Sequence, residues 1–424
     1  MKLILNKIKS SQLSFLIGSN IVSQLILLLA LPILARIFNP EQMGELSFLI
    51  SLLSIFNIFS LLKYELALPL EKKQNIYINL LILNILTLVI FSFVLALLSY
   101  GFLSINNMNL SPYIFIFLPF IVFAEGLYNI SIYYGLRNKY FNNIAWSKVN
   151  KSLITSTSQV TFGILNNTSV SLMLGDVLGR TFGGFKLIKK ILTELRDNIK
   201  LIKPRRIKYA ALKYIKFPKY TVPGSFLNGA TLHLFPVFIA AYFNPYFLGI
   251  YTISQRITIG PMLFISQAVS QYYISAIGNL SQKEDFKAIK KVFVKFTFYL
   301  FSLSSLIALI IYVSADFIVS NLLGEQWNEA AGVIKHLSIL LVFQFTVSPL
   351  SQTLNSINKQ EQQFLLDLLR FILVVIVATN TLYFDLPFKE TIKFYVYSMS
   401  ISYLINYIFT WKNIKKQVES LNNR

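Results

Sequence analysis

The chain has 424 residues, of which 55% are hydrophobic and 13% are charged, about half the charged fraction of a soluble domain. It contains no cysteine, which excludes disulfides, thiolate metal sites and cysteine nucleophiles, and two histidines cannot build a metal site alone. The net charge of +21 would suggest nucleic acid in a soluble protein. Here the positive charges lie beside apolar segments, so membrane orientation and anionic headgroups account for them, and we expect no nucleic-acid partner.

Twelve apolar segments are each long enough to cross a membrane as a helix, which takes about 20 residues. The first is too long and too polar inside to be a cleaved signal peptide, so we interpret it as a retained span. The sequence therefore predicts an all-α polytopic membrane protein with about twelve transmembrane helices. In chain order the predicted spans are 12–35, 46–64, 76–102, 112–135, 144–165, 168–188, 217–242, 246–276, 291–318, 330–354, 362–383 and 391–411.

Basic residues fall in every second gap between these spans, starting with the N-terminus. Because Lys and Arg collect on the cytoplasmic side, the alternation predicts that both termini are cytoplasmic. No gap exceeds about 30 residues, so we expect no soluble catalytic domain. The central gap is the most basic, and its stretch 189–214 predicts either an amphipathic helix on the inner leaflet or a solvated linker. Its charges are Lys189, Lys190, Arg196, Lys200, Lys203, Arg205, Arg206, Lys208, Lys213, Lys216 and Lys219.

A short motif recurs at about half the chain length. Phe38-Asn39-Pro40 with Gly44 returns as Phe243-Asn244-Pro245 with Gly249. Asn-Pro breaks a helix, and the glycine lets the next helix pack closely. The repeat predicts two six-helix lobes, 1–200 and 201–424, related by a pseudo-two-fold axis along the membrane normal, with a central cavity and a substrate site between them.

The stretch 35–47, with Pro40, Glu41 and Gly44, and the later triplet Lys63-Tyr64-Glu65 resemble the start of polysaccharide-export flippases. More narrowly they resemble the O-antigen (Wzx-type) flippases of the multidrug/oligosaccharidyl-lipid/polysaccharide exporter superfamily. Lys63 stands where arginine is common, which keeps the charge but loses the fork geometry. The resemblance implies a cavity that opens alternately to each side, and an undecaprenyl-diphosphate-linked oligosaccharide as cargo in the bacterial inner membrane.

Several cations in the predicted spans are candidates for contact with the diphosphate of such a cargo. Lys148 and Lys151 share one face of the fifth span with Gln159, although both lysines can instead snorkel to headgroups. Arg256 lies near half depth in the eighth span, on one face with Gln267. In the first span Asn20 and Gln24 form an i, i+4 pair that predicts either a cavity wall or a helix–helix hydrogen bond.

Acidic residues in the spans allow two interpretations each. Asp176 and Arg180 are spaced i, i+4, which predicts an intrahelical ion pair, or else Arg180 contacts cargo while Asp176 is its partner or a proton carrier. Glu125 stands alone in its span as a candidate for H⁺ or Na⁺ coupling, or as a hydrogen-bond partner of nearby hydroxyls. Lys63 and Glu65 predict an interfacial ion pair that positions a gate. We expect no other cofactor.

Three rival functions follow from the same pattern. A drug or metabolite antiporter of the same superfamily would favour an acidic cavity, whereas this chain carries more cations than anions at membrane depth. A membrane-embedded polysaccharide polymerase or glycosyltransferase would need a sizeable outer loop or an Asp-rich motif, which the sequence lacks. A channel or scaffold would not require the repeat. The sequence therefore predicts a flippase rather than an enzyme, with other polysaccharide assembly proteins as further partners.

Overall fold

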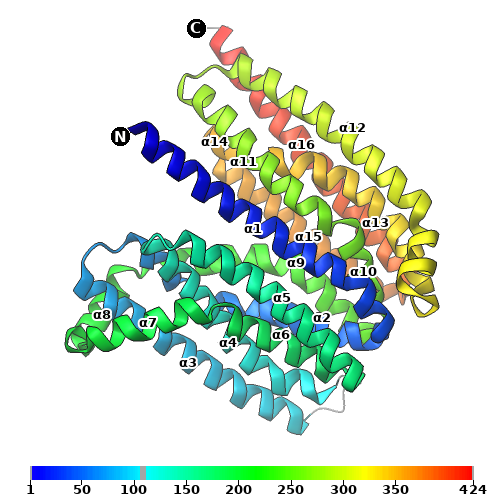
Figure 1. Cartoon of the computed structure of the whole chain (residues 1–424). Coiled ribbons are helices and arrows are strands. Elements are labelled where there is room, and N and C mark those ends of the chain that lie inside the picture. Colours follow the sequence, from blue (N-terminus) through cyan, green and yellow to red (C-terminus); the bar gives the residue numbers. More distant parts are fainter. Residues whose placement is uncertain (1, 106–110, 423–424) are drawn as a thin grey trace. The chain divides into compact units, whose positions relative to one another are not determined.

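A computed structural model describes residues 2–105 and 111–422, which are helical throughout apart from short connections (Figure 1). Within these residues there is no β-strand. The helices are α1 (Lys2–Ile37), α2 (Pro40–Ser60), α3 (Gln74–Ile105), α4 (Pro112–Arg137), α5 (Phe141–Leu165), α6 (Ser169–Gly183), α7 (Phe185–Asp197), α8 (Pro204–Lys213), α9 (Val222–Tyr242), α10 (Pro245–Thr258), α11 (Gly260–Gln282), α12 (Phe286–Ile318), α13 (Asn328–Val347), α14 (Gln352–Ser356), α15 (Gln360–Phe384) and α16 (Phe388–Asn422).

Short helical turns join some of these elements. They are η1 (Tyr64–Leu70), η2 (Ile199–Leu201), η3 (Phe217–Thr221), η4 (Val319–Leu323), η5 (Glu325–Trp327) and η6 (Ser348–Leu350). The central gap, predicted to be one amphipathic helix or a linker, is two helices, α7 and α8, joined through η2.

Each of the twelve predicted spans coincides with helix. By length and apolarity 8 helical segments among the described residues qualify as membrane spans; the other predicted spans lie at α5, α6, α10–α11 and α16 and are more polar. The span 246–276 is divided between α10, which ends at Thr258, and α11, which begins at Gly260, as 168–188 is divided between α6 and α7. Pro261 explains this junction, since it has no backbone N–H to donate to the carbonyl four residues earlier.

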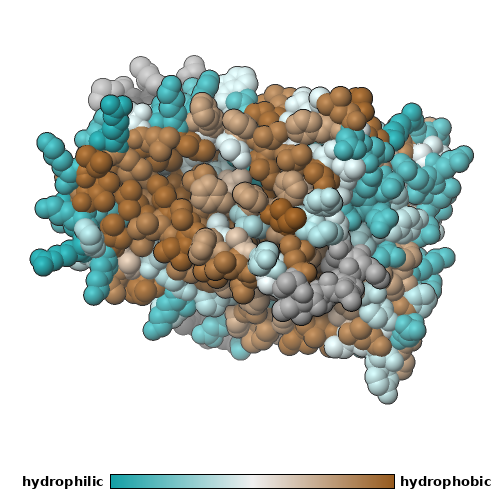
Figure 2. Space-filling view, turned by 90° about the horizontal axis from the view of Figure 1, so that it is seen from below, coloured by the Kyte–Doolittle hydropathy of each residue, from teal (hydrophilic) through white to brown (hydrophobic). Residues whose placement is uncertain are grey.

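Large apolar side chains cover much of the molecular surface. On α3, for example, Phe93, Leu97 and Leu98 are all more than half exposed, and Figure 2 shows a broad hydrophobic area on the face that it draws, bordered by hydrophilic side chains. An apolar patch of this extent is unfavourable in water. The chain is therefore a multi-pass membrane protein whose apolar surface contacts lipid.

The helices form two compact units, Met1–Gly249 and Ile250–Arg424. This division falls later than the predicted lobe boundary at 200/201, because α9 packs on α2 within the first unit. Phe59 of α2 and Phe226 of α9 lie with ring centroids 5.5 Å apart. Packing and sequence repeat thus divide the chain at different residues.

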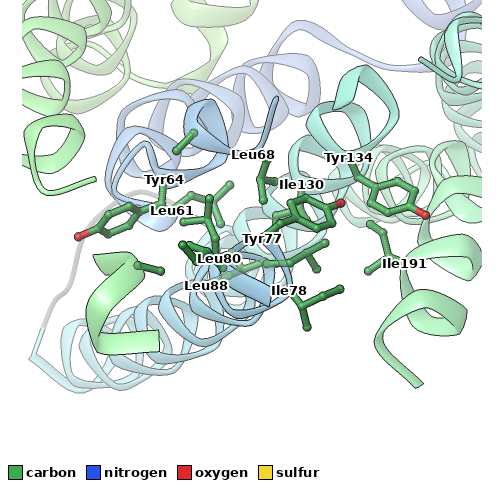
Figure 3. Packing of buried hydrophobic residues seen from close by; sticks show 14 of the residues in the cluster. Leu61, Tyr64, Leu68, Tyr77, Ile78, Leu80, Leu88, Ile130, Tyr134 and Ile191 are labelled. Carbon is green, nitrogen blue, oxygen red and sulfur yellow. The ribbon is translucent and has the colours of Figure 1, made fainter. Parts of the chain in front are cut away.

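The hydrophobic core of the first unit lies where η1 packs against α3, α4 and the helices of the central gap, α7 and α8 (Figure 3). Tyr77 is fully buried in one cluster with Leu68 and Ile130. Leu187 and Ile191 of α7 and Ala210 of α8 belong to the same cluster. Burying side chains of this size contributes about 1.5–3 kcal/mol each. The central gap is therefore packed onto the first unit along one face, which rules out a fully solvated linker.

The second unit has its own core between α11, α12, α13 and α16. Phe293 of α12 stacks on Tyr407 of α16 at 5.4 Å between ring centroids. Tyr273 is completely buried, and its hydroxyl lies 2.7 Å from that of Thr353. Each unit thus has hydrophobic packing of its own, which supports the description of two units.

Both copies of the repeated motif begin a helix in the same way. Asn39 caps α2 by accepting a hydrogen bond from the Gln42 amide at 2.9 Å, and Asn244 caps α10 by accepting one from the Phe247 amide at 3.1 Å. Side-chain oxygens at this position satisfy the free amides of a helix start. The predicted helix break at both Asn-Pro pairs is confirmed.

The glycines of the motif allow the two helix starts to touch. A Cβ at Gly44 would overlap the carbonyl oxygen of Pro245, and a Cβ at Gly249 would overlap that of Pro40. The two copies therefore pack backbone against backbone, each glycine on the proline of the other copy. The predicted close packing at the glycines is confirmed, and the contact is reciprocal.

Candidate functional site

Four charged side chains meet inside the first unit, where α4, α5 and α6 pack together. Lys151 Nζ donates to Glu125 Oε2 at 2.8 Å, and Arg180 Nη1 donates to the same oxygen at 2.5 Å. Arg180 also donates to Asp176, from Nε at 2.7 Å and from Nη2 at 3.3 Å. We call Glu125, Lys151, Asp176 and Arg180 the charge quartet; it contains two cations and two anions.

The quartet is largely withdrawn from solvent. The exposed fractions of the side chains are 15% for Glu125, 11% for Arg180 and 9% for Asp176, whereas Lys151 keeps 21%. The ammonium of Lys151 also lies 4.2 Å from the centre of the Tyr128 ring, a cation–π distance. Charges buried at membrane depth persist only when they are paired or functional. Lys151 is the most accessible member of the quartet.

Glu125 is therefore not the isolated carboxylate that its sequence context suggested. The missing signal was the position of its partners on two other helices, 26 and 55 residues away along the chain. The i, i+4 pair between Asp176 and Arg180 was predicted, and its geometry is confirmed. Whether any member contacts cargo or carries an ion stays a prediction.

A row of small residues on α6 brings the quartet together. Gly175, Gly179 and Gly183 follow each other at four-residue spacing on the face that packs against α5. A Cβ at Gly179 would lie 2.9 Å from the Lys151 carbonyl oxygen, and one at Gly183 would lie 2.7 Å from the Lys151 Cβ. Small residues spaced in this way allow helices to approach closely in membranes. We missed this motif in the sequence, although its spacing is readable there.

Two other predicted residues of the fifth span have protein partners. Lys148 Nζ donates to Asn20 Oδ1 of α1 at 2.9 Å, and Gln159 donates to the Leu172 carbonyl of α6 at 3.0 Å. The predicted helix–helix hydrogen bond of Asn20 is thus present, with a partner on α5. Gln24 lies one turn further along α1 and is half-buried.

The candidates of the eighth span belong to the second unit. Arg256 lies in the last turn of α10, just before the break at Ile259, and is half-buried. The side chain of Gln267 lies outside the described residues. That both residues share one face stays a prediction.

Lys63 and Glu65 lie at η1, where α2 ends. Their charged atoms are 4.0 Å apart, and Lys63 adopts a left-handed backbone with φ of 62°. Glu65 is buried, and burial raises the pKa of its carboxyl above the ordinary value. The predicted interfacial ion pair is present in a long form, and its role as a gate stays a prediction.

Glu71, at the end of η1, is a second buried carboxylate that sequence reasoning overlooked. It accepts hydrogen bonds from Lys213 Nζ, from the Tyr214 hydroxyl at 3.0 Å and from the Lys73 amide at 2.8 Å. Burial opposes its charge, but the hydrogen bonds outweigh that cost and hold the pKa of Glu71 below its ordinary value. Glu71 therefore connects the end of α8, through Lys213 and Tyr214, to the residues just before α3.

A pocket of about 700 Å³ opens in the first unit beside the starts of α2 and α6. Glu41 and Glu45 line it together with Asn39, Asn166 and Tyr113. Its charged lining residues are acidic, whereas α7 and α8 are rich in Lys and Arg. The sequence gave no sign of this cavity.

A family model described as "Polysaccharide biosynthesis protein" matches residues 33–332. This match spans most of the chain. The chain belongs to the polysaccharide biosynthesis protein family. Among curated protein sequences none matches it.

Solved structures share the fold of this polysaccharide biosynthesis protein. The lipid II flippase MurJ in an inward closed conformation aligns with a TM-score of 0.71 at 14% identity, covering 94% of this chain and 86% of MurJ. An inward-facing multidrug resistance MATE family transporter of the MOP superfamily aligns with a TM-score of 0.66 at 12% identity, covering 93% and 96%. A point mutant of the Vibrio cholerae MATE transporter VcmN aligns with a TM-score of 0.57 at 10% identity, covering 97% of each chain. The predicted all-α polytopic fold is confirmed.

Proposed function

We propose that this chain is a flippase that moves an undecaprenyl-diphosphate-linked oligosaccharide, an O-antigen or a related repeat unit, across the bacterial inner membrane by alternating access. Family membership over residues 33–332 carries the proposal, and the fold shared with a lipid II flippase supports it. The cargo is carried without covalent chemistry, so the protein is not an enzyme. Both termini lie in the cytoplasm in this proposal, following the alternation of basic gaps.

The polar head of such a cargo must cross the apolar layer, and cations at membrane depth lower that barrier. Lys148, Lys151, Arg180 and Arg256 are the proposed contacts for the diphosphate. Lys151 is the first choice among them, because it is the most exposed of the quartet and is held by one hydrogen bond to Glu125. Arg180 is held by one hydrogen bond to Glu125 and two to Asp176, so in this proposal it contacts the diphosphate from its place in the quartet.

The remaining candidates have supporting roles in this proposal. Asn20, Gln24, Gln159 and Gln267 supply polar walls, and Lys63 with Glu65 positions a gate. Glu125 and Asp176 would couple transport to H⁺ or Na⁺ by accepting that cation when Lys151 leaves. Cargo drives such a change only as far as its affinity differs between the two states.

A multidrug transporter is the second candidate, favoured by the fold shared with MATE proteins. The two functions differ in the charge of the cargo. The direct test is the purified protein in vesicles, with a fluorescent undecaprenyl-diphosphate oligosaccharide in one set and a cationic dye in another. We expect the lipid-linked glycan to reach the opposite leaflet and the dye to stay. Dye transport without glycan translocation would overturn the proposal.

Deletion of the gene in its host gives an independent test. We expect long-chain surface polysaccharide to disappear and to return when the intact gene is supplied. Arg256→Ala should lose export, whereas Arg256→Lys should keep part of it. Lysine keeps the positive charge of arginine but lacks its fork of hydrogen-bond donors. Full export by Arg256→Ala would remove this residue from the site.

A further inference from the structure

The outward face of α7 alternates large apolar side chains with cations. Phe185, Lys189, Leu192 and Arg196 recur at three- or four-residue spacing, so they share one face of the helix. All four are exposed, with Phe185 at 57% and Leu192 at 62%. The opposite face of α7 is buried through Leu187 and Ile191. This helix therefore has a free, apolar and basic side.

Helix α8 repeats the pattern. Arg205, Lys208, Tyr209 and Leu212 are all exposed, with Tyr209 at 54% and Leu212 at 60%, while Ala210 is fully buried on the first unit. We call the exposed residues of both helices the basic strip: Phe185, Lys189, Leu192, Arg196, Arg205, Lys208, Tyr209 and Leu212.

Several contacts hold the basic strip firmly to the first unit. Asn79 of α3 donates to the Leu201 carbonyl at 2.9 Å and accepts from the Lys203 amide at 2.9 Å. The Tyr64 hydroxyl donates to the Ala211 carbonyl at 3.2 Å, and Lys213 pairs with Glu71. The strip is thus presented by packed helices rather than by a free segment.

Contacts along α7 place the strip where the spans reach their ends. Lys190 Nζ lies 3.7 Å from the ring centre of Tyr140, between α4 and α5, and Glu194 accepts from Gln74 at the first residue of α3 at 2.8 Å. Phe185 precedes Glu194 by about 13 Å of helix, and the neighbouring Gly184 lies against Tyr128 and Ser131 of α4, before the end of that helix at Arg137. The strip therefore runs from the level of Tyr128 in α4 to the ends of the spans, with apolar and basic side chains alternating along it.

We propose that the basic strip binds the headgroups of anionic phospholipids. A soluble acidic protein or a nucleic acid would match the cations but would leave Phe185 and Leu192 against water. A leaflet with anionic lipids satisfies both kinds of side chain, since apolar residues enter the acyl boundary and cations meet the phosphates. Lipid binding by the basic strip does not depend on which cargo the protein moves.

The experiment uses the full chain, which contains no natural cysteine. Thr193→Cys, beside the strip, carries a bimane label in nanodiscs of phosphatidylcholine with phosphatidylglycerol. Quenching is compared between spin-labelled phosphatidylglycerol and spin-labelled phosphatidylcholine at equal fractions. We expect about threefold stronger quenching by the anionic lipid. Each basic residue of the strip adds to the attraction for phosphatidylglycerol, so this lipid is enriched beside the label. A label at Leu97→Cys on the lipid-facing side of α3 should be quenched equally by both lipids.

Removing the charges tests the assignment. The variant K189Q/R196Q/R205Q/K208Q should lower the ratio at Thr193→Cys to about one. The matched variant K283Q/K287Q/K291Q/K295Q, which removes four charges from the second unit, should leave the ratio unchanged. Equal quenching in the otherwise unsubstituted protein, or a preference that survives K189Q/R196Q/R205Q/K208Q, would overturn the proposal. If that variant fails to fold, K189Q and R196Q alone must each lower the ratio.

Discussion

Two buried carboxylates in the first unit differ in how they are neutralised. Glu125 sits in the middle of α4 and receives hydrogen bonds from two cations on other helices. Glu71 sits at the end of η1 and receives one cation, one hydroxyl and one backbone amide. The cation of Glu71, Lys213, is one-third exposed, whereas Arg180 is almost enclosed.

Glu71 and its partners form an anchor that holds α8 to the first unit, whereas Glu125 belongs to the charge quartet, in which two cations balance two anions. At Glu71 water reaches the partner, so loss of the pair is partly compensated by solvent. In the quartet Arg180 and Asp176 are almost enclosed, so removal of one of them leaves a buried charge without its counterion. The structure therefore assigns unequal costs to similar substitutions in the two places.

The largest effect is expected for Arg180→Ala. It leaves Glu125 and Asp176 with Lys151 as their remaining quartet cation, and breaking a buried pair in this way costs about 3–5 kcal/mol. The apparent unfolding temperature in detergent should fall sharply, and so should the yield of monodisperse protein. Arg180→Lys, which keeps the charge, is the matched control and should lose less. Equal stability of Arg180→Ala and the parent would contradict the description of the quartet as a closed network.

A second test separates the charges from the packing that unites them. Gly179→Ala should push α6 from α5, because its Cβ would meet the Lys151 carbonyl and the Thr155 side chain; overpacking of this kind costs about 1–3 kcal/mol. Gly18→Ala is the control, since nothing lies within 4 Å of its added Cβ. Thermal denaturation of both variants should show a loss only at Gly179.

The hydrogen bonds of Glu71 should make the stability of the protein depend on pH. The pKa of Glu71 is held below the ordinary value, so its stabilisation is complete above about pH 4.3 and is lost as the pH falls through the lowered value. Glu71→Gln should be about 1–2 kcal/mol less stable than the parent at neutral pH. The gap between the two unfolding temperatures should shrink on acidification below the ordinary value. A gap that widens there would show that the sign is wrong.

The smallest effect is expected at Tyr64. Tyr64→Phe removes one hydrogen bond to the Ala211 carbonyl, worth about 1 kcal/mol, and leaves the packing of the ring in place. The unfolding temperature should drop slightly. Hydrogen exchange should rise in α8 and stay unchanged in α5 and α6, which would confirm that α8 is fastened separately from the quartet.

The helices and the repeated motif could be predicted from the sequence, but the ion pairs between different helices could not. Runs of apolar residues sufficed for the spans, and the Asn-Pro pairs sufficed for the starts of α2 and α10. The pair between Asp176 and Arg180 was accessible because both lie on one helix. Glu125 and Glu71 were not, since their cations come from segments 26 to 142 residues away, and no local pattern records which helices become neighbours. The spacing of Gly175, Gly179 and Gly183 is the one signal that was readable and overlooked.

The central claim is that the charge quartet serves translocation as well as folding. The double variant Glu125→Gln/Lys151→Gln removes one anion and one cation together, so the quartet stays neutral and the Arg180–Asp176 pair remains. The most direct measurement is translocation of a fluorescent undecaprenyl-diphosphate oligosaccharide by this variant in vesicles, beside its unfolding temperature. We predict near-parental stability with translocation lost. Near-parental translocation at near-parental stability would reduce the quartet to a structural element and contradict the account.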